Sequence, residues 1–287
     1  MVKRLELFVN RRLSKNSSRV SRVLKKAHKE EVSEMQSYAL ITGATSGIGL
    51  ALTKIFWDKG YSLILVGRNK HKLAALEKQL KGERTDLKVV ICKQDLSQAG
   101  AGAALYLWVK QQQLSVDILI NNAGAGYVGE FCECSATKIE ELMTLNMTSL
   151  TELTYEFAKE MKRRRRGKIL NVASTGSYHP GAYTAVYYAT KAYVLSLSEA
   201  LYKELKPYGV TVSSLCPGAT ATQFAKSAGR VDAGFAMSAE FVAKKAFEGL
   251  QKGKKVIIPG IQNKLLIKVP RSIAAYFVAR YQQKLKA

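Results

Sequence analysis

A tyrosine and a lysine four positions apart occur in the stretch AVYYATK, which contains Tyr187, Tyr188 and Lys191. A free tyrosine has a pKa near about 10, and a neighbouring ammonium group favours its ionised form. Such a pair is therefore suited to general acid–base catalysis. Each residue alone is equally compatible with core packing or with a solvated amine, so the elements that position the pair have to be considered.

A glycine-rich turn is the second feature with chemical meaning, in the sequence TGATSGIG of residues 42–49. Its glycines stand between a predicted strand and a predicted helix. Glycines there allow a tight turn and the close approach of a pyrophosphate, to which the helix N-terminus offers free N–H groups. The spacing is not G-x-G-x-x-G, and no Gly-Lys-Ser/Thr of a Walker loop follows. We predict a dinucleotide site with contacts from Gly43, Thr45, Ser46, Gly47, Ile48 and Gly49.

A dinucleotide site distinguishes NAD(H) from NADP(H) by the residue near the end of the second strand, about 20 residues after the glycines. NAD sites place an Asp or Glu there, but this chain has Gly67, Arg68 and Asn69. Without a carboxylate nothing repels a 2′-phosphate, and Arg68 can pair with one in a fork geometry. The sequence favours NADP(H) over NAD(H), with contacts from Arg68 and Asn69. A merely solvated Arg68 is the alternative.

Short apolar runs alternate with helical patterns along residues 38–260. Most strands read as continuous apolar segments, which indicates strands covered on both faces. Strands that alternate with helices favour a doubly wound parallel sheet of the Rossmann type, an α/β fold of about seven strands with helices on both faces. The predicted strands are residues 38–42, 61–67, 87–95, 116–124, 167–174, 210–218 and 254–259, and the predicted helices are residues 50–60, 70–82, 101–112, 137–163, 184–205 and 239–250.

Five motifs follow one another on these elements: TGxxxGxG at 42–49, NNAG at 121–124, a serine 13 positions before Tyr187, the Tyr187/Lys191 pair, and CPGATAT at 216–222. Together they resemble the short-chain dehydrogenase/reductase family over about residues 38–260. The family pattern Tyr-x-x-x-Lys selects Tyr187. Helix geometry agrees, since Tyr187 shares a face with Lys191 while Tyr188 points roughly 100° away. Tyr188 is then expected to be a packing residue.

The resemblance implies that a hydride passes between a nicotinamide and a carbonyl carbon, with Tyr187 as general acid or base. Lys191 would lower the pKa of Tyr187 and hold the nicotinamide ribose. Ser174 would hydrogen-bond the substrate oxygen. Asn146 would kink its helix and hold a water that links Lys191 to solvent. The expected catalytic residues are therefore Asn146, Ser174, Tyr187 and Lys191.

Cofactor contacts outside the glycine-rich turn are also implied by the resemblance. Asp95 matches the acid that bonds the adenine, whereas Asn121 is expected to stabilise the sheet. The other contacts fall on two short segments and on the catalytic pair: Asn122, Ala123 and Gly124 along the adenine-side ribose, Pro217, Gly218 and Thr222 at the carboxamide of the nicotinamide, and Tyr187 and Lys191.

Substrate choice is expected from three loops, residues 125–131, 176–183 and 219–238. The last loop is rich in small residues and is expected to be mobile, as the lids of the family are. The aromatic residues of these loops either line an apolar pocket or belong to the core: Tyr127, Phe131, Tyr178 and Phe224. The sequence does not name the substrate.

The composition restricts the class of protein. Hydrophobic residues make up 47% of the 287 residues, which is enough for a sizeable core. No stretch approaches the roughly 18 apolar residues of a membrane-spanning helix. The first 37 residues lack a signal peptide's apolar segment, so a cytoplasmic location is expected. Cys132 and Cys134 have no second Cys/His pair beside them, so we expect reduced thiols and no metal site.

The formal charge of +23 is concentrated at the two ends of the chain. Residues 1–37 carry ten Lys/Arg and four Glu, and residues 251–287 carry nine Lys/Arg and no acid. The run KRRRR at 162–166 lies at a predicted helix C-terminus, where cations complement the helix dipole, so a solvated helix end is the simpler explanation of this run.

Apolar residues recur at helical spacing within both basic ends. The N-terminal set is Val20, Val23, Leu24 and Ala27, and the C-terminal set, which follows the helix-opening Pro270, is Ile273, Tyr276, Phe277 and Tyr281. Basic amphipathic helices are typical of membrane-surface elements. Packing on the domain or on a second subunit is the alternative.

We therefore predict a basic helical arm (1–37), a Rossmann catalytic domain (38–260) and a basic amphipathic C-terminal extension (261–287). The predicted function is that of an NADP(H)-dependent oxidoreductase that interconverts a small-molecule carbonyl and alcohol. A homodimer or homotetramer is expected, with an anionic membrane surface as a further partner of the termini. The alternatives are a reductase of 3-oxoacyl or other lipid-like substrates and a protein that binds or senses NADP(H) without turnover. No stacking-aromatic or helix-turn-helix pattern supports nucleic-acid binding.

Overall fold

The computed structural model describes residues 37–224, 228 and 236–285. The predicted arm of residues 1–36 and most of the loop 225–235 lie outside the described residues, as do the side chains of Val20, Val23, Leu24 and Ala27. Ser37–Ala287 forms one compact unit.

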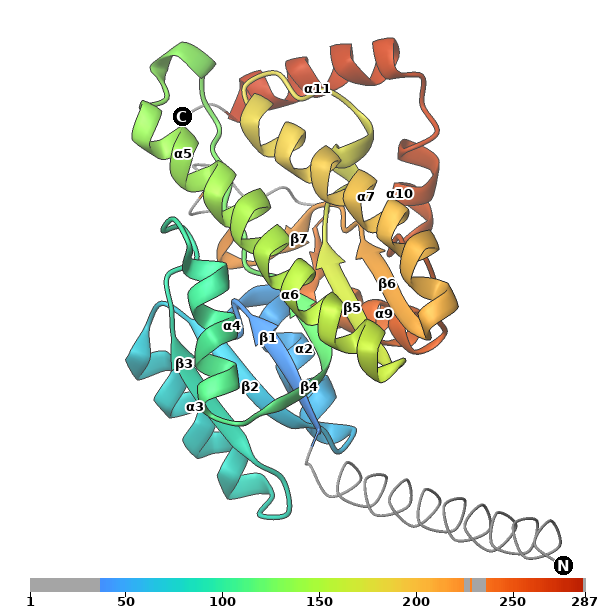
Figure 1. The fold of residues 1–287 in the computed structure, drawn as a ribbon. Coiled ribbons are helices and arrows are strands. Elements are labelled where there is room, and N and C mark those ends of the chain that lie inside the picture. Colours follow the sequence, from blue (N-terminus) through green and yellow to red (C-terminus); the bar gives the residue numbers. More distant parts are fainter. Residues whose placement is uncertain (1–36, 225–227, 229–235, 286–287) are drawn as a thin grey trace, which may run out of the picture. The chain divides into compact units, whose positions relative to one another are not determined.

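Seven parallel strands form the central sheet in the order β3-β2-β1-β4-β5-β6-β9 (Figure 1). This confirms the predicted doubly wound sheet. The order reverses direction between β1 and β4, and ligands of open α/β sheets bind at such a point, beyond the carboxyl ends of the strands. The strands are β1 (Ser37–Thr42), β2 (Ser62–Gly67), β3 (Val89–Lys93), β4 (Ser115–Asn121), β5 (Gly167–Val172), β6 (Val210–Leu215) and β9 (Val256–Ile257).

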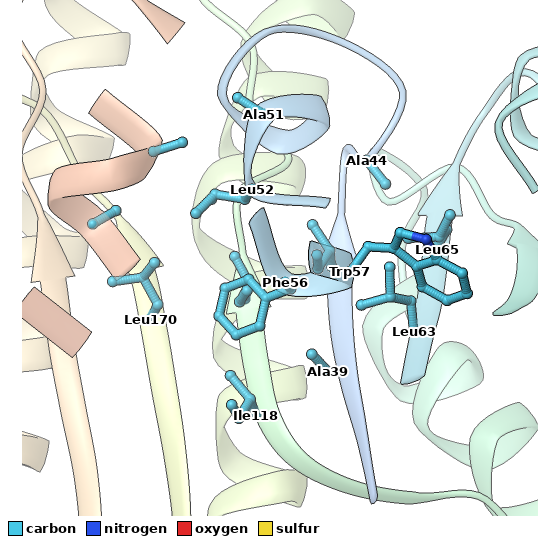
Figure 2. Close-up of a cluster of buried hydrophobic side chains, with 14 of the residues drawn as sticks. Ala39, Ala44, Ala51, Leu52, Phe56, Trp57, Leu63, Leu65, Ile118 and Leu170 are labelled. Atoms are coloured by element: carbon cyan, nitrogen blue, oxygen red, sulfur yellow. The ribbon is translucent and has the colours of Figure 1, made fainter. Parts of the chain in front are cut away.

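Helices cover both faces of this sheet because successive residues of each strand point to opposite sides and both sets are apolar. Ala39 and Ile41 of β1 pack with α2 (Gly47–Asp58), α3 (Lys70–Glu83) and α9 (Ala239–Gln251). Figure 2 shows Phe56 of α2 above Ala39 in this layer. Tyr38 and Leu40 pack on the other face with α4 (Ala101–Gln111), α6 (Ser149–Arg164) and α7 (Ala185–Leu205).

Five strands end earlier than predicted: β3 ends at Lys93 instead of residue 95, β9 ends at Ile257 instead of residue 259, and three others end before their motif residues. β4 ends at Asn121, β5 at Val172 and β6 at Leu215, whereas the apolar runs extended to residues 124, 174 and 218. The motif residues at the end of each run therefore belong to loops at the carboxyl edge of the sheet. Loops at this edge form the ligand sites of open α/β folds.

The helix predicted for residues 137–163 is interrupted. It consists of α5 (Ala136–Met143), a π-helical turn η2 (Thr144–Thr148) and α6. The π turn contains the fully buried Asn146, so the long predicted helix is interrupted at the residue where the resemblance implied a kink. π turns inside helices are frequent at functional sites.

The charged run 162–166 ends α6, as predicted, with Arg165 in the left-handed conformation after the last helical residue. Solvation was expected there, but Arg164 is only partly exposed. Its guanidinium donates to the Val116 carbonyl at 2.6 Å and to Asp117 Oδ1 at 3.1 Å. Arg164 therefore joins the end of α6 to β4.

The remaining elements are short, apart from the last helix. They are the 3₁₀ turns η1 (Phe131–Glu133), η3 (Thr175–Tyr178) and η4 (Lys206–Tyr208), the paired strands β7 (Thr220–Ala221) and β8 (Met237–Ser238), α10 (Ile261–Leu266) and α11 (Arg271–Leu285). α11 begins directly after Pro270, whose carbonyl accepts a bond from the Ala274 N–H at 2.9 Å. This confirms the predicted C-terminal helix.

Candidate active site

The glycine-rich turn joins β1 to α2 at the carboxyl edge of the sheet. Gly43 and Gly47 have φ angles of +67° and +52°, which residues with a side chain rarely adopt. A Cβ on Gly49 would lie 2.1 Å from the Gly43 carbonyl oxygen and 2.5 Å from Nδ2 of Asn122. The first turn of α2 contains no acidic residue and its N-cap Ser46 makes no side-chain cap. Such a helix start suits an anionic group.

Thr42 and Asn122 hold this turn against the end of β4. The Thr42 Oγ1 accepts bonds from the N–H groups of Asn122 and Ala123, both at 3.0 Å. The Asn122 Nδ2 donates in turn to the Thr42 carbonyl at 2.9 Å. Two of the expected cofactor contacts, Asn122 and Ala123, therefore lie beside the glycine-rich turn, and Asn122 also supports its shape.

Arg68 follows the last residue of β2 and is exposed. A Cβ on Gly67 would lie 3.7 Å from Thr45 Oγ1, so Thr45 stands at the same strand end. Asn69 caps α3 by accepting a bond from the Lys72 N–H at 3.0 Å, a structural task that needs no ligand. In the part of the chain that the structure describes, Arg68 forms no ion pair with a carboxylate.

Asp95 lies in the loop after β3, where its Oδ1 accepts bonds from the Ser97 N–H at 3.0 Å and the Ser97 hydroxyl at 2.8 Å. These bonds fix the loop as an Asx turn. The predicted contact of Asp95 with an adenine stays a prediction.

Lys191 is the buried cation of the site, with 3% of its surface exposed. Its Nζ donates to the Val172 carbonyl at 2.7 Å and lies 5.8 Å from the centre of the Tyr187 ring. A Cβ on Gly124 would lie 3.3 Å from this Nζ and 3.2 Å from Oδ1 of Asn146. Because burial penalises the charged form, the pKa of Lys191 is lowered to about 8. Gly124, Asn146, Tyr187 and Lys191 thus meet at one place.

The Asn146 side chain satisfies its hydrogen bonds inside the protein. Its Nδ2 donates to the Ala125 carbonyl at 2.9 Å and to Thr190 Oγ1 at 3.1 Å, and its Oδ1 accepts the Ala125 N–H at 3.0 Å. Thr190 donates onward to the Tyr187 carbonyl at 2.8 Å. Asn146 therefore ties the loop after β4 to the first turns of α7. The water that the resemblance assigns to it stays a prediction.

Ser174 stands at the start of η3, immediately beyond β5. Its Oγ accepts the Gly176 N–H at 3.0 Å, so its own hydrogen is free to be donated elsewhere. The neighbouring Ser177 hydroxyl donates to the Lys191 carbonyl at 2.7 Å. The loop that carries Ser174 is in this way fastened to the helix that carries Lys191.

The two tyrosines of the opening motif have different surroundings. A Cβ on Gly176 would lie 3.0 Å from Cε1 of Tyr188, and one on Gly181 would lie 2.5 Å from its Cγ. Tyr188 therefore packs closely on the loop 176–181. The half-buried Tyr187 ring faces Phe224 instead, with ring centres 5.4 Å apart.

The segment after β6 reaches both the glycine-rich turn and α10. Its Pro217 carbonyl accepts the Thr175 N–H at 2.9 Å. A Cβ on Gly47 would lie 2.9 Å from Cγ2 of Thr222. A Cβ on Gly218 would lie 2.3 Å from Oδ1 of Asn263. Asn263 is absent from the residues that the sequence pointed to, since only the fold brings α10 to this loop.

A cleft beside the start of α7 is lined by aromatic and small residues: Tyr127, Gly129, Phe131, Cys134, Tyr183, Thr184, Ala185 and Val186. Tyr183 has a φ of 60°, a conformation that L side chains rarely adopt, and its carbonyl accepts the Gly129 N–H at 2.8 Å. Tyr127 and Phe131 therefore belong to a cleft, one of the two alternatives that the sequence left open.

Phe224 and Tyr178, for which the sequence left pocket or core open, have different surroundings in the structure. A Cβ on Gly126 would lie 3.0 Å from Cζ of Phe224, so Phe224 bridges the loop after β4 and the Tyr187 ring. Tyr178 packs against the buried Cys216 cluster, and burial raises its pKa. Tyr178 is therefore a core residue rather than a pocket residue.

The described residues contain no group of three or more His, Cys, Asp or Glu that could hold a metal ion. Cys132 is exposed and Cys134 is partly buried, and neither forms a disulfide. Among the described helices none is long and apolar enough to cross a membrane.

Residues 37–232 match the family model of the short chain dehydrogenases. A solved short-chain dehydrogenase from Sphingobium yanoikuyae, in complex with NADPH, is 32% identical, with a TM-score of 0.74 over 82% of this chain and 97% of that one. The bulky-bulky ketone specific alcohol dehydrogenase from Comamonas testosteroni is 30% identical, with a TM-score of 0.70 over 83% and 96% of the chains. A very-long-chain 3-oxoacyl-CoA reductase-like protein of Arabidopsis thaliana is 34% identical over 76% of this chain and 72% of its own.

The chain belongs to the short-chain dehydrogenase family.

As a short-chain dehydrogenase, the protein is an oxidoreductase that interconverts a carbonyl and an alcohol with a nicotinamide dinucleotide. The turn of residues 43–49 fits this cofactor, because close packing leaves no room for a side chain at its three glycines and the helix start that follows offers N–H groups with no acidic residue nearby. Arg68 directly follows β2, and Asp95 lies in the loop after β3, as expected. Their contacts with a cofactor stay predictions.

Proposed function

We propose that this short-chain dehydrogenase is an NADPH-dependent reductase in which Tyr187 gives a proton to the carbonyl oxygen of the substrate. The observation that carries the proposal is the meeting of Gly124, Asn146 and Lys191 next to the Tyr187 ring. Bound NADPH would supply the hydride for the carbonyl carbon.

The remaining chemistry is assigned to side chains of the chain. As negative charge develops on the carbonyl oxygen, the Tyr187 hydroxyl donates its proton to it. The Lys191 ammonium, 5.8 Å from the ring, stabilises the tyrosinate that remains. Ser174 donates its free hydroxyl hydrogen to the same oxygen. Asn146 positions Lys191 relative to the loop after β4, because it bonds Ala125 of that loop and Thr190, the neighbour of Lys191.

The substrate class that we infer is a 3-oxoacyl thioester. Relatives in Arabidopsis thaliana and Caenorhabditis elegans are named very-long-chain 3-oxoacyl-CoA reductases or proteins like them. The cleft beside the start of α7 is lined by Tyr127, Phe131 and Val186, whose apolar side chains suit an acyl chain. A bulky ketone is the second candidate, favoured by the similarity to the Comamonas testosteroni enzyme.

A turnover screen separates these substrates. NADPH oxidation is measured with 3-oxoacyl-CoA esters of increasing chain length and with bulky diaryl ketones. We expect kcat/KM for the best ester to exceed that for the ketones by about tenfold or more, since acyl contacts with the cleft add binding energy. A preference of the same size for the ketones would assign the protein to the second candidate.

Preference for NADPH over NADH is part of the proposal and is supported by the exposed Arg68 at the end of β2. Arg68→Ala should weaken NADPH binding by about ten- to a hundredfold, because a charge-assisted contact with the 2′-phosphate is worth roughly 1.5–3 kcal/mol. NADH binding should stay unchanged, since NADH carries no such phosphate. Equilibrium titration of both cofactors measures the two effects.

Lys78→Ala is the matched control for Arg68→Ala, because Lys78 is an exposed cation farther along α3. It should leave both dissociation constants unchanged. Equal affinity of the unmodified protein for NADPH and NADH would refute the preference.

A protein that binds or senses NADP(H) without turnover is the alternative from another class. It predicts tight NADPH binding together with no oxidation of NADPH by any carbonyl of the screen. The full set of acid–base side chains at Asn146, Ser174, Tyr187 and Lys191 favours an enzyme. The cytoplasmic location and the division at residues 37 and 260 stay predictions.

A further inference from the structure

The C-terminal helices α10 and α11 carry an unusual share of the exposed apolar surface. In the described part of the chain, thirteen large hydrophobic side chains are exposed, and seven of them lie on these two helices. Their exposed fractions run from 44% to 75%. We call these seven the docking face: Ile261, Leu265, Leu266, Ile273, Tyr276, Phe277 and Tyr281. Exposed apolar side chains gathered in this way mark an interaction site.

The orientation of α11 is the reverse of that of a helix packed on its own domain. Its inward positions are Ala274 and Gln282, which are 3% and 1% exposed. Its outward positions include Tyr276 and Phe277, which are 61% and 63% exposed and whose rings meet at 5.6 Å. A helix that stabilises its own domain buries its large apolar residues. α11 instead leaves its large apolar residues exposed.

Hydrogen bonds fix the orientation of α10. The Asn263 Nδ2 donates to the Pro259 carbonyl at 2.7 Å, and Nε2 of the buried His179 lies 3.3 Å from the Leu266 carbonyl. The His179 contact therefore attaches the end of α10 to the body of the domain. Figure 1 shows α11 at the end of the domain to which the carboxyl ends of β5 and β6 point.

The charges around the docking face have one sign. Lys264, Lys268, Arg271 and Arg280 are exposed, and among the described residues none of them is paired with a carboxylate. Residues 251–287 contain no acid at all. A second copy docked on the same face about a two-fold axis would set these cations against each other. The charge therefore disfavours self-association and favours an anionic partner.

We propose that the docking face binds the surface of a lipid bilayer that carries anionic headgroups. The apolar side chains enter the boundary between headgroups and acyl chains, and the cations pair with headgroup phosphates. Tyr276 suits this boundary because its ring is apolar while its hydroxyl, 3.4 Å from Nη1 of Arg280, stays in the polar layer. This interaction is independent of the proposed substrate.

Sedimentation of the full chain with vesicles tests the proposal. The full chain should bind vesicles of phosphatidylcholine with roughly one-third phosphatidylglycerol, should not bind phosphatidylcholine alone, and should be released by high salt. Ile273→Gln with Phe277→Gln keeps every charge and should lower the partition coefficient by about tenfold or more. The matched control, Met143→Gln with Phe241→Gln, removes two exposed apolar side chains elsewhere and should bind like the unmodified chain.

A charge variant keeps the test decisive if the apolar variant misfolds. Lys264→Gln, Lys268→Gln and Arg280→Gln together should weaken binding to anionic vesicles. The control, Lys54→Gln, Lys72→Gln and Lys78→Gln, removes three exposed cations of α2 and α3 and should have a much smaller effect.

Three results would overturn the proposal. The full chain could stay in the supernatant with anionic vesicles at low salt. The folded apolar variant could bind as strongly as the unmodified chain, which would assign the binding to another basic segment. Light scattering without lipid could show that the apolar variant dissociates an oligomer that the unmodified chain forms, which would make the docking face an interface between copies.

Discussion

Replacing Tyr187 with Phe is expected to lower kcat for carbonyl reduction by about 10²- to 10⁴-fold, because the variant loses only the hydroxyl that gives the proton. The ring contacts with Phe224 at 5.4 Å and with the Lys191 ammonium at 5.8 Å need no hydroxyl. The dissociation constant for NADPH should therefore change little. Steady-state kinetics and a fluorescence titration of NADPH measure the two quantities on the same preparation.

Tyr188→Phe is the matched control, since Tyr188 differs from Tyr187 by one position and packs on Gly176 and Gly181. Its ring is retained in the variant, so most of the activity should remain. If Tyr188→Phe were inactive and Tyr187→Phe active, the assignment of the proton donor would be wrong. Loss of NADPH binding in Tyr187→Phe would mean that the hydroxyl serves the cofactor site instead.

Gly49→Ala is expected to have the second large effect. The added Cβ would lie 2.1 Å from the Gly43 carbonyl oxygen, and a backbone atom inside a tight turn cannot move away without distorting the turn. The turn is the predicted cradle of the cofactor pyrophosphate, so affinity for NADPH should fall by about a hundredfold or more. The melting temperature should fall as well, because the turn joins β1 to α2.

Gly82→Ala controls for the substitution itself. No atom lies within 4 Å of a Cβ at Gly82, and the position is in the last turn of α3. Alanine is a better helix former than glycine by about 0.8–1 kcal/mol, so stability should be equal or slightly higher. An unchanged melting temperature and NADPH affinity in Gly49→Ala would contradict the role of the turn.

The sheet could be predicted from the sequence because its determinants are local. Leu63 and Leu65 of β2 pack on one face, and Ile64 and Val66 pack on the other, so the strand had to read as an uninterrupted apolar run. The strand ends were harder to predict, because the apolar run continues beyond the last sheet residue: Ala173 and Cys216 lie in loops and are buried.

The interruption at Asn146 could not be predicted from helical periodicity. Its cause is tertiary: the side chain bonds Ala125, 21 positions earlier, and Thr190, 44 positions later. Only the resemblance suggested a kink there. Asn263 could not be predicted either, because it meets Gly218 only where α10 folds back on the loop after β6.

The motif residues were found because chemistry restricts their types and spacing. Gly43, Gly47 and Gly49 lie at the junction of β1 and α2, and Tyr187 and Lys191 belong to one helix, so a short stretch defines each group. Loop aromatics carry no such signal. Phe224 faces Tyr187 whereas Tyr178 joins the core, and both read as apolar residues of a loop.

The most direct test of NADPH-dependent carbonyl reduction follows deuterium from the cofactor to the product. The unmodified protein is incubated with NADPH deuterated at the transferable position and with the best substrate of the screen. Mass spectrometry should find an alcohol that carries one deuterium on the former carbonyl carbon, and the Tyr187→Phe sample should contain almost none. If the protein binds NADPH but no carbonyl of the screen yields a deuterated alcohol, the account is contradicted and the protein is a binder of the cofactor.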